Sequence, residues 1–263
     1  MSAASKKYRY PGINFFEEAQ KDRFHGRSKE SEQLCALLVQ EKLTVLFGKS
    51  GYGKTSLLNA GVRPLLLEKS SRGKRRYLPV SIRFNAWNGE ETLLDKFARQ
   101  FGSAAAEANL PPATHGVALP PTLWGTVRTF QSRPITNNQS PNNQYTNTPI
   151  TNPQSPVFVL LFDQFEEFFT YPPEQQQDFK NQLAELLYAD YPYFLEQNEA
   201  TLHPEQIAAL ADRLEVRTLF SIRADRLHEL DRLSDRLYAI LHKRIELHAL
   251  PRAEAEKAIV LPA

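Results

Sequence analysis

Short apolar runs alternate with helix-like stretches along most of the 263 residues. Five runs rich in apolar and β-branched residues predict strands, namely Leu43–Phe47, Pro79–Phe84, Val157–Phe162, Val216–Ile222 and Arg244–His248. Three of them are nearly continuous in such residues, as strands buried on both faces should be. Helical spacing marks Thr92–Ala108, Glu174–Tyr188 and Pro204–Leu214. This alternation predicts an α/β protein in which helices cover both faces of a parallel sheet.

The stretch from 132 to 156 breaks the alternation. Within it, Pro134–Pro156 contains no charged residue, and the octapeptide PITNNQSP returns as PITNPQSP. Asn, Gln, Pro, Ser and Thr at this density bury too little surface to offset the entropy of ordering the chain. We expect a disordered insertion between a helix and the third strand.

Bulk composition excludes several classes of protein. With 41% hydrophobic and 24% charged residues, the chain can bury a large core and stay soluble. A net charge of +2 is not that of a protein that coats nucleic acid. The single cysteine, Cys35, excludes an intrachain disulfide, and no apolar run approaches the ~20 residues that span a bilayer. The amino terminus also lacks a signal-peptide pattern, so we expect a cytoplasmic protein without membrane contact.

The motif GKSGYGKT follows the first predicted strand and fits the phosphate-loop pattern G-x-x-x-x-G-K-[ST]. Gly48 and Gly53 are expected to take backbone conformations that turn successive N–H groups toward an anion. Lys54 is expected to bridge the β- and γ-phosphates, and the Thr55 hydroxyl to ligate Mg²⁺. The predicted nucleotide contacts are Gly48, Lys49, Ser50, Gly51, Tyr52, Gly53, Lys54, Thr55 and Ser56.

The third predicted strand runs into LFDQFEEFFT, in which three carboxylates lie among four phenylalanines. Such carboxylates repel one another and lose solvation unless a cation lies among them. A phosphate loop requires an acid at a strand end for its magnesium ion, so we predict that Asp163 holds Mg²⁺ carried by the nucleotide. Glu166 or Glu167 can then accept a proton from the attacking water or orient it. For Glu167 a solvated helix turn is the alternative.

The fourth predicted strand ends at Arg223. An arginine at this place can reach a γ-phosphate and distinguish ATP from ADP. The alternative is a surface arginine that pairs with Asp225.

Four stretches resemble the novel STAND NTPases, a family of signal-transduction ATPases with numerous domains. They are YPGINFFEEAQKDRFHGR, GKSGYGKTSLLNAGVRPLL, LLFDQFEEFFT and LPRAEAEKAIVLPA. A further stretch, SIRFNAWNGEE, is instead similar to the Phe-Asn-x-Trp pattern of the KAP group of P-loop ATPases.

The resemblance implies a three-layer α/β/α P-loop core of the additional-strand, conserved-glutamate type, with strand order 5-1-4-3-2. It implies that Phe24, Gly26 and Arg27 lie near the adenine and that Arg223 is the sensor. By the same analogy Asp163 holds magnesium, and the catalytic candidates are Lys54, Glu166, Glu167 and Arg223, with Glu166 ahead of Glu167.

The resemblance also suggests the division of the chain. Residues 1–26 would form a lead-in near the nucleotide, 27–250 the core, and 251–263 the start of a helical lid. Members of the family continue into a lid and then into repeat or effector modules, so we expect such modules downstream, together with homo-oligomer formation on activation. Because the lid completes the site, hydrolysis by this chain is expected to depend on it.

The leading functional hypothesis is an ATP-dependent switch with slow, Mg²⁺-dependent hydrolysis. A DNA-associated P-loop ATPase is one alternative, based on KSSRGKRR at Lys69–Arg76, although a solvated loop explains that run as well. A nucleotide-binding scaffold that does not hydrolyse is the other. No base-reading motif distinguishes ATP from GTP.

Overall fold

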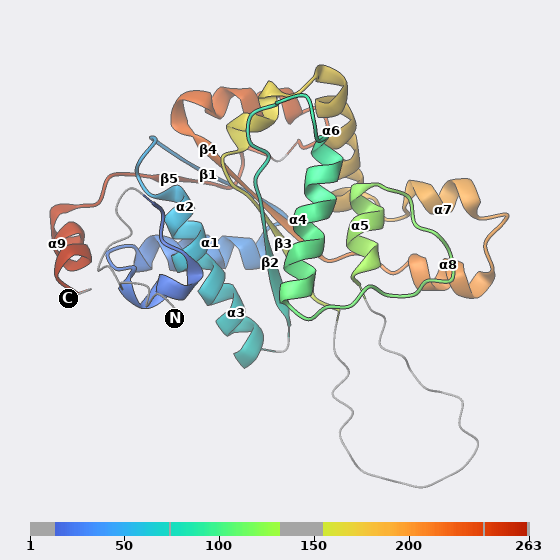
Figure 1. Ribbon diagram of the computed structural model, residues 1–263, viewed down its shortest axis with the longest axis horizontal. Coiled ribbons are helices and arrows are strands. Elements are labelled where there is room, and N and C mark those ends of the chain that lie inside the picture. The colour runs from blue at the N-terminus through green and yellow to red at the C-terminus, as the bar shows by residue number, and fades with distance from the viewer. Residues whose placement is uncertain (1–13, 74, 132–154, 239, 262–263) are drawn as a thin grey trace, which may run out of the picture.

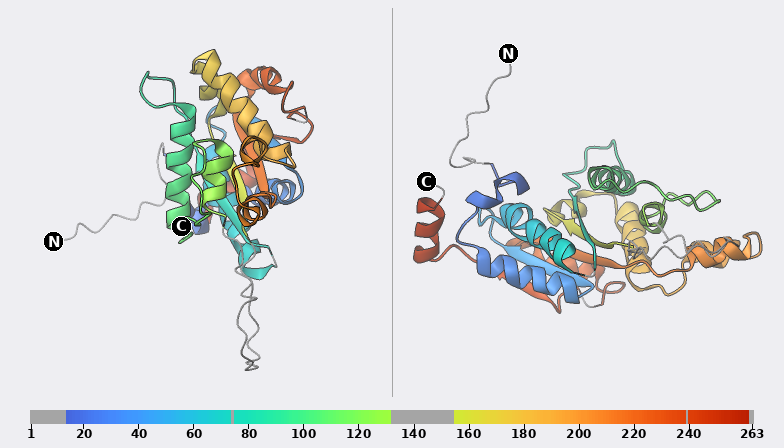
Figure 2. Two further views of the ribbon diagram at one scale, coloured as in Figure 1. Left: turned by 90° about the vertical axis from the view of Figure 1, so that its right-hand side faces the viewer. Right: turned by 90° about the horizontal axis from the view of Figure 1, so that it is seen from below.

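The computed structural model describes residues 14–73, 75–131, 155–238 and 240–261. These residues form one central twisted sheet with helices on both sides (Figures 1 and 2). The arrangement confirms the predicted three-layer α/β/α fold.

The strands of the sheet are β1 (Leu43–Gly48), β2 (Tyr77–Ile82), β3 (Val157–Phe162), β4 (Val216–Arg223) and β5 (Arg244–Leu247). Their spatial order is β2-β3-β4-β1-β5, and every neighbouring pair is parallel. Read from the other edge, this is the predicted order 5-1-4-3-2.

The bounds of β2 differ from the prediction. The strand begins two residues before Pro79 and ends at Ile82, so that Pro79 lies inside it. A proline has no N–H for a ladder hydrogen bond, and prolines in sheets are therefore common at the first residue of a strand. Because β2 is an edge strand, Pro79 can lie within it without leaving a neighbouring strand unpaired. Arg83 consequently lies just past the carboxyl end of β2.

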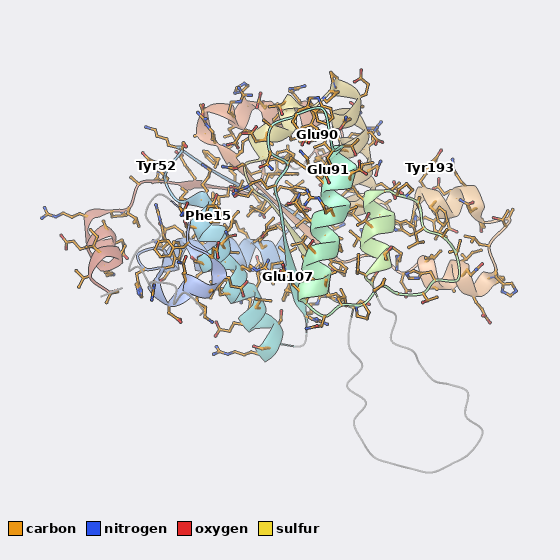
Figure 3. The ribbon with its side chains drawn as sticks, viewed as in Figure 1. Phe15, Tyr52, Glu90, Glu91, Glu107 and Tyr193 are labelled. Carbon is orange, nitrogen blue, oxygen red and sulfur yellow. The ribbon has the colours of Figure 1, made fainter. Side chains whose placement is uncertain are left out.

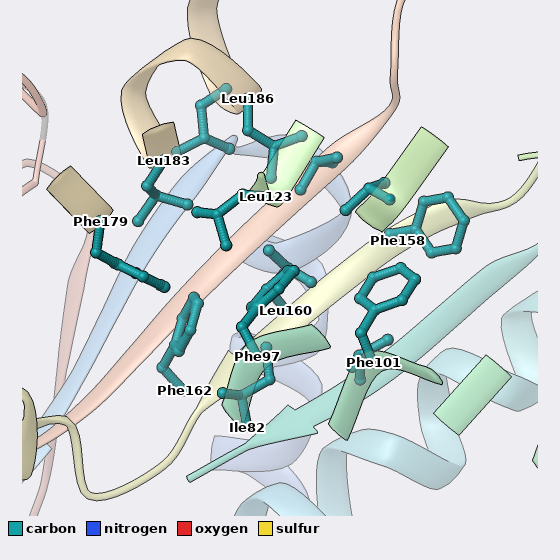
Figure 4. Close-up of a cluster of buried hydrophobic side chains, with 14 of the residues drawn as sticks. Ile82, Phe97, Phe101, Leu123, Phe158, Leu160, Phe162, Phe179, Leu183 and Leu186 are labelled. Atoms are coloured by element: carbon teal, nitrogen blue, oxygen red, sulfur yellow. The ribbon is translucent and has the colours of Figure 1, made fainter. Parts of the chain in front are cut away.

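Alternate residues of β3 face the two helical layers, and all six are buried. Phe158, Leu160 and Phe162 belong to the larger core. That core is covered by α4 (Leu93–Glu107), α5 (Leu123–Thr129) and α6 (Pro173–Tyr188), and Figure 4 shows part of it. Val157, Val159 and Leu161 face the opposite layer, formed by α1 (Ser28–Gln40) and the helix after the phosphate loop. The sheet therefore separates two hydrophobic cores.

The helix after the phosphate loop is continuous but not uniform. It consists of α2 (Lys54–Ser56), a π-helical stretch η2 (Leu57–Val62) and α3 (Arg63–Arg72). The Arg63 N–H donates to the carbonyl of Leu58, five residues earlier. Pro64 follows at once and cannot donate, and its ring would press on the carbonyl four residues earlier in a regular α-helix. The widened turn accommodates this proline.

The remaining elements connect or flank the core. They are the 3₁₀ segments η1 (Glu18–Arg23), η3 (Phe165–Thr170) and η4 (Ala224–Leu233), and the helices α7 (Tyr193–Asn198), α8 (Pro204–Leu210) and α9 (Arg252–Val260). The helix expected over Pro204–Leu214 thus ends at Leu210, and 211–215 lead into β4. Most of the expected insertion, 132–154, lies outside the described residues. No helix within the described ranges combines the length and apolarity needed to cross a membrane.

Candidate functional site

The phosphate loop owes its shape to three glycines that act in two different ways. Gly51 and Gly53 have φ angles of 80° and 88°, in the left-handed region that favours glycine. A Cβ on either would meet nothing within 4 Å, so the requirement there is conformational. At Gly48, by contrast, a Cβ would lie 2.5 Å from the carbonyl oxygen of Leu247 in β5. Gly48 is the last residue of β1 and does not have a left-handed φ angle, so the expectation of an unusual backbone there was wrong. Close approach of the neighbouring strand is what requires glycine at this position.

Lys54 points back into the loop that precedes it. Its Nζ donates to the carbonyl oxygens of Gly48 at 2.9 Å and Lys49 at 3.3 Å. Burial lowers the pKa of Lys54, and the carboxylates of Glu166 and Asp163 oppose that shift. The ammonium group therefore lies at the centre of the loop, where a bound anion would draw it forward. Tyr52, labelled in Figure 3, lies at the turn just before it, while Lys49 and Ser50 are exposed.

Asp163 is the point at which the phosphate loop and two further strands meet. The Thr55 hydroxyl donates to its Oδ2 at 2.8 Å, and the Ser221 hydroxyl of β4 donates to its Oδ1 at 3.2 Å. The main-chain N–H of Asp163 donates to the carbonyl of Ile82 at 2.9 Å. The structure thus brings together the two residues expected to hold magnesium, although 108 positions separate them in the sequence.

Arg83 is a site residue that the sequence analysis did not identify. Its Nη2 forms an ion pair with Oδ2 of Asp163, the same oxygen that accepts from Thr55. The register explains the contact, because Ile82 pairs with Phe162 and the next residues of both strands therefore lie side by side. The sequence does contain the two residues that follow these strand ends, Arg83 after Ile82 and Asp163 after Phe162. They could have predicted the ion pair only if the pairing of the two strands had been known. A cation of the protein itself therefore lies beside the acids.

The chain turns sharply after Asp163. Gln164 has a φ of 53°, a left-handed conformation that is uncommon outside glycine, and η3 begins at the next residue. This turn directs Glu166 toward β4, where its Oε2 accepts from the main-chain N–H of Arg223 at 3.3 Å. Burial raises the pKa of Glu166, and the nearby Lys54 charge opposes the shift. A carboxylate with a raised pKa beside the phosphate loop has the properties of a general base.

Glu167 and Arg223 have other surroundings. Glu167 is partly buried, and its carbonyl accepts from the Thr170 hydroxyl at 2.7 Å, within η3. The guanidinium of Arg223 forms two hydrogen bonds with Asp225, at 3.0 and 2.8 Å, which raise its pKa. The structure therefore shows the pairing that was the alternative for Arg223, while its backbone contacts Glu166.

Arg27 lies behind the phosphate loop and is only 5% exposed. Its Nη2 donates to the carbonyls of Tyr52 at 3.1 Å and His248 at 2.7 Å, and its Nη1 pairs with Glu30 at 2.8 Å. These contacts connect the phosphate loop to the segment that follows β5. Arg27 thus acts on the loop through main-chain carbonyls.

Phe24 and Gly26 lie on the same segment. The Phe24 ring packs against Phe16, with 5.6 Å between centroids. Gly26 has a φ of 83°, and a Cβ on it would lie 2.5 Å from the carbonyl oxygen of Glu254 in α9. The lead-in and α9 are therefore in direct contact through a glycine.

These residues fit a nucleotide with magnesium. The left-handed glycines and the start of α2 form a cradle of N–H groups for an anion. A threonine hydroxyl and one carboxylate are hard oxygen donors, and Mg²⁺ is usually bound by one or two carboxylates together with substrate phosphates and water. Among the described residues, no group of three or more His, Cys, Asp or Glu residues could hold a metal ion.

The basic run at Lys69–Arg76 lies at the end of α3 and before β2. Arg72 pairs with Glu68, and Arg76 donates to the carbonyl of Ala108 at 3.1 Å. Residue 74 lies outside the described ranges. The DNA-binding alternative remains a prediction.

Comparisons with known proteins bear on the family and the fold. The family model "Novel STAND NTPase 1" matches residues 10–263. The ORC2 protein of Aeropyrum pernix, in its ADPNP-ADP complexes, aligns with a TM-score of 0.53 at 13% identity, over 95% of this chain and 56% of that chain. The Walker-type ATPase paby2304 of Pyrococcus abyssi aligns with a TM-score of 0.51 at 13% identity, over 93% of this chain and 59% of that chain.

Both structural similarities concern the fold alone. The chain spans a little more than half of the length of each of these structures. A comparison with curated proteins finds no match.

Proposed function

The chain belongs to the novel STAND NTPase 1 family, and on this premise we propose that it is a switch that binds ATP, hydrolyses it slowly and changes conformation with the nucleotide state. The family and the P-loop fold make it a nucleotide-binding ATPase domain. The switch in signalling or defence is the step that we add.

Phosphate binding is assigned to the loop and to Lys54. The N–H groups at Gly51, Gly53 and the start of α2 would surround the β-phosphate. Lys54 would exchange its hydrogen bonds with the Gly48 and Lys49 carbonyls for bonds to the β- and γ-phosphates. Its partial burial supports this role, because a charge in a poorly solvated place gains most from an anion.

Thr55 and Asp163 would hold Mg²⁺ at the junction of the loop and β3. When bound, this ion neutralises charge on the phosphate oxygens. Ser221 would keep Asp163 oriented through its bond to Oδ1. The observation that carries the proposal is the 2.8 Å hydrogen bond between the Thr55 hydroxyl and Asp163, directly beside Lys54.

Glu166 is assigned as the general base that accepts a proton from the attacking water. Its raised pKa and its place opposite Lys54 support the assignment. Glu167 is the second candidate. Arg223 would sense the γ-phosphate after its side chain leaves Asp225, and because its N–H binds Glu166, that movement would also affect the base.

The conformational change that follows nucleotide binding would be transmitted through the lead-in and α9. Phe24 and Gly26 would border the adenine, and Arg27 would transmit changes in the loop through the Tyr52 and His248 carbonyls. The contact between Gly26 and α9 supports a route from the nucleotide to a lid and to downstream modules. Assembly into a homo-oligomer on activation belongs to the same proposal.

Phosphate release and nucleotide binding test the proposal together. Wild type should bind MgATP and release phosphate slowly. Glu166→Gln should bind ATP normally and lose about 10²-fold or more in kcat, the range for removing a general base. Glu167→Gln, one residue along the same 3₁₀ segment, is the matched control and should keep most of the rate.

Lys54→Ala should abolish nucleotide binding while its far-UV circular dichroism stays that of wild type. Unchanged ATP affinity in Lys54→Ala would refute the phosphate-loop assignment. If wild type, Glu166→Gln and Glu167→Gln all bind nucleotide and none of them releases phosphate, the chain is a scaffold and the hydrolytic part of the proposal fails.

A further inference from the structure

Arg83 and Thr55 share one oxygen of Asp163. Both donate to Oδ2, while Oδ1 accepts from Ser221. Oδ2 is also the oxygen nearest the Thr55 hydroxyl, with which Asp163 would hold magnesium. Two donors thus already use the two lone pairs of Oδ2, so a divalent cation at this oxygen would have to replace one of them. Because the arginine carries a like charge and the Thr55 hydroxyl does not, the arginine is the donor that the cation would displace.

The main chain around Arg83 is anchored. Its N–H donates to Oε1 of Gln100 at 2.9 Å, and its carbonyl accepts from Nε2 of the same side chain at 3.0 Å. Gln100 lies on α4, which packs on the sheet. These two contacts hold the main chain only, and the Arg83 side chain is 31% exposed. A rotamer change can therefore release Asp163 while the backbone stays in place.

We propose that Arg83 is the counter-ion of Asp163 when no metal is bound, and that Mg²⁺ entering with a nucleotide displaces it. Arg83 then sets how much magnesium the site requires. The inference rests on the proposed function, because it assumes that Asp163 receives the metal ion.

Displacement of Arg83 would also change the contacts of the lead-in. The Phe15 ring lies over the guanidinium, with 5.4 Å from Cζ to the ring centroid. The next residue, Phe16, donates its N–H to Oγ of Ser56 at 3.1 Å, and Ser56 follows the metal-binding Thr55. Phe15 is labelled in Figure 3 and is 40% exposed. The lead-in thus contacts both the arginine that leaves and the neighbour of the threonine that remains.

A magnesium titration tests the competition. ADP binding is followed by calorimetry at fixed ADP while Mg²⁺ is varied, so that hydrolysis plays no part. Arg83→Gln should bring half-maximal binding at about fivefold less Mg²⁺ than wild type needs, the size expected for a partly exposed arginine–carboxylate pair. Arg83→Lys keeps the charge but not the planar guanidinium, and should fall between the two.

Arg99→Gln is the matched control. Arg99, on α4, also forms an ion pair through its guanidinium, with Glu91 just before that helix, and its side chain is 60% exposed. It should keep the magnesium requirement of wild type. An equal or higher requirement in Arg83→Gln would overturn the inference. If wild type binds no ADP at any magnesium concentration, the proposed function has failed instead, so the two failures are distinct.

Hydrogen exchange of residues 14–23 tests the connection to the lead-in. In wild type, MgADP should raise amide exchange in this segment, because Phe15 loses its partner. In Arg83→Gln the exchange should already be raised without nucleotide, and MgADP should add little. An equal response to MgADP in both proteins would show that the lead-in does not depend on Arg83.

Discussion

The charges of Lys54 and Glu166 each act on the pKa of the other group. Burial lowers the pKa of Lys54 and raises the pKa of Glu166, while their opposite charges resist both shifts. The pKa values of the two groups are thus shifted in opposite directions, and perturbed groups of this kind are common at functional sites. Both oxygens of Asp163 accept from hydroxyl or guanidinium donors.

The raised pKa of Glu166 predicts the pH dependence of hydrolysis. A general base must be deprotonated, so kcat should fall as the pH drops through the pKa of Glu166. Because that pKa lies above the ordinary glutamate value of 4.5, the decline should begin at a higher pH than for a free carboxylate. A pH profile of phosphate release checks this. Glu167→Gln should keep the acidic limb, and a limb at the ordinary position would contradict the assignment.

Arg27 should contribute mainly to stability. Arg27→Ala leaves the carbonyls of Tyr52 and His248 without this donor in a buried place, and should lower the free energy of unfolding by about 2 kcal/mol. Urea denaturation without nucleotide measures it. The exposed Arg99→Ala should cost less than about 0.5 kcal/mol. If Arg27→Ala changes only nucleotide affinity, Arg27 acts at the adenine directly.

At the scale of elements, the helix after the phosphate loop explains the motif LLNAGVRP. Pro64 is accommodated by the π-helical stretch, and Gly61 lies where α1 and the lead-in come closest to it. A Cβ on Gly61 would overlap with the Ser31 hydroxyl and lie 3.1 Å from Cε1 of Phe24. The motif is therefore needed for packing behind the site, whereas Lys54 and Thr55 carry the chemistry.

Two glycine substitutions distinguish the effect of packing on stability from the effect of helix propensity. Gly61→Ala should destabilise the protein by about 1–3 kcal/mol through overpacking against Ser31 and Phe24. Gly102→Ala, inside α4, would place its Cβ 4.0 Å from Cζ of Phe130, an ordinary contact distance, and should stabilise by about 0.5–1 kcal/mol. Thermal denaturation of both variants measures the difference. Equal effects would show that Gly61 is not a contact point.

At the scale of the whole molecule, the order β2-β3-β4-β1-β5 assembles the site. Ligands of parallel sheets bind outside the carboxyl ends of the strands. The ends of β1, β2, β3 and β4 supply the phosphate loop, Arg83, Asp163 and Arg223, from positions spread over most of the chain. The division into lead-in, core and lid, and the disorder of 132–156, remain predictions.

Because the site exists only in the folded chain, magnesium and nucleotide should stabilise the whole domain. At 100 times its dissociation constant, MgADP should add about 2.7 kcal/mol and raise Tm in proportion to the logarithm of its concentration. Lys54→Ala should show no such rise. A rise of equal size in Lys54→Ala would place nucleotide binding elsewhere.

Features that depend on neighbours in the chain were readable from the amino-acid sequence. The bounds of β3, the phosphate-loop motif and the acids at Asp163 and Glu166 come from contiguous motifs, because local propensity and residue spacing carry them. The sheet order was implied by the family resemblance alone. Arg83 beside Asp163, the Arg27 contacts with distant carbonyls, and the reason for Gly48 came from the folded chain. Each depends on strand register or on close approach between segments far apart in the chain. Tertiary packing sets those distances, and no local sequence pattern predicts them.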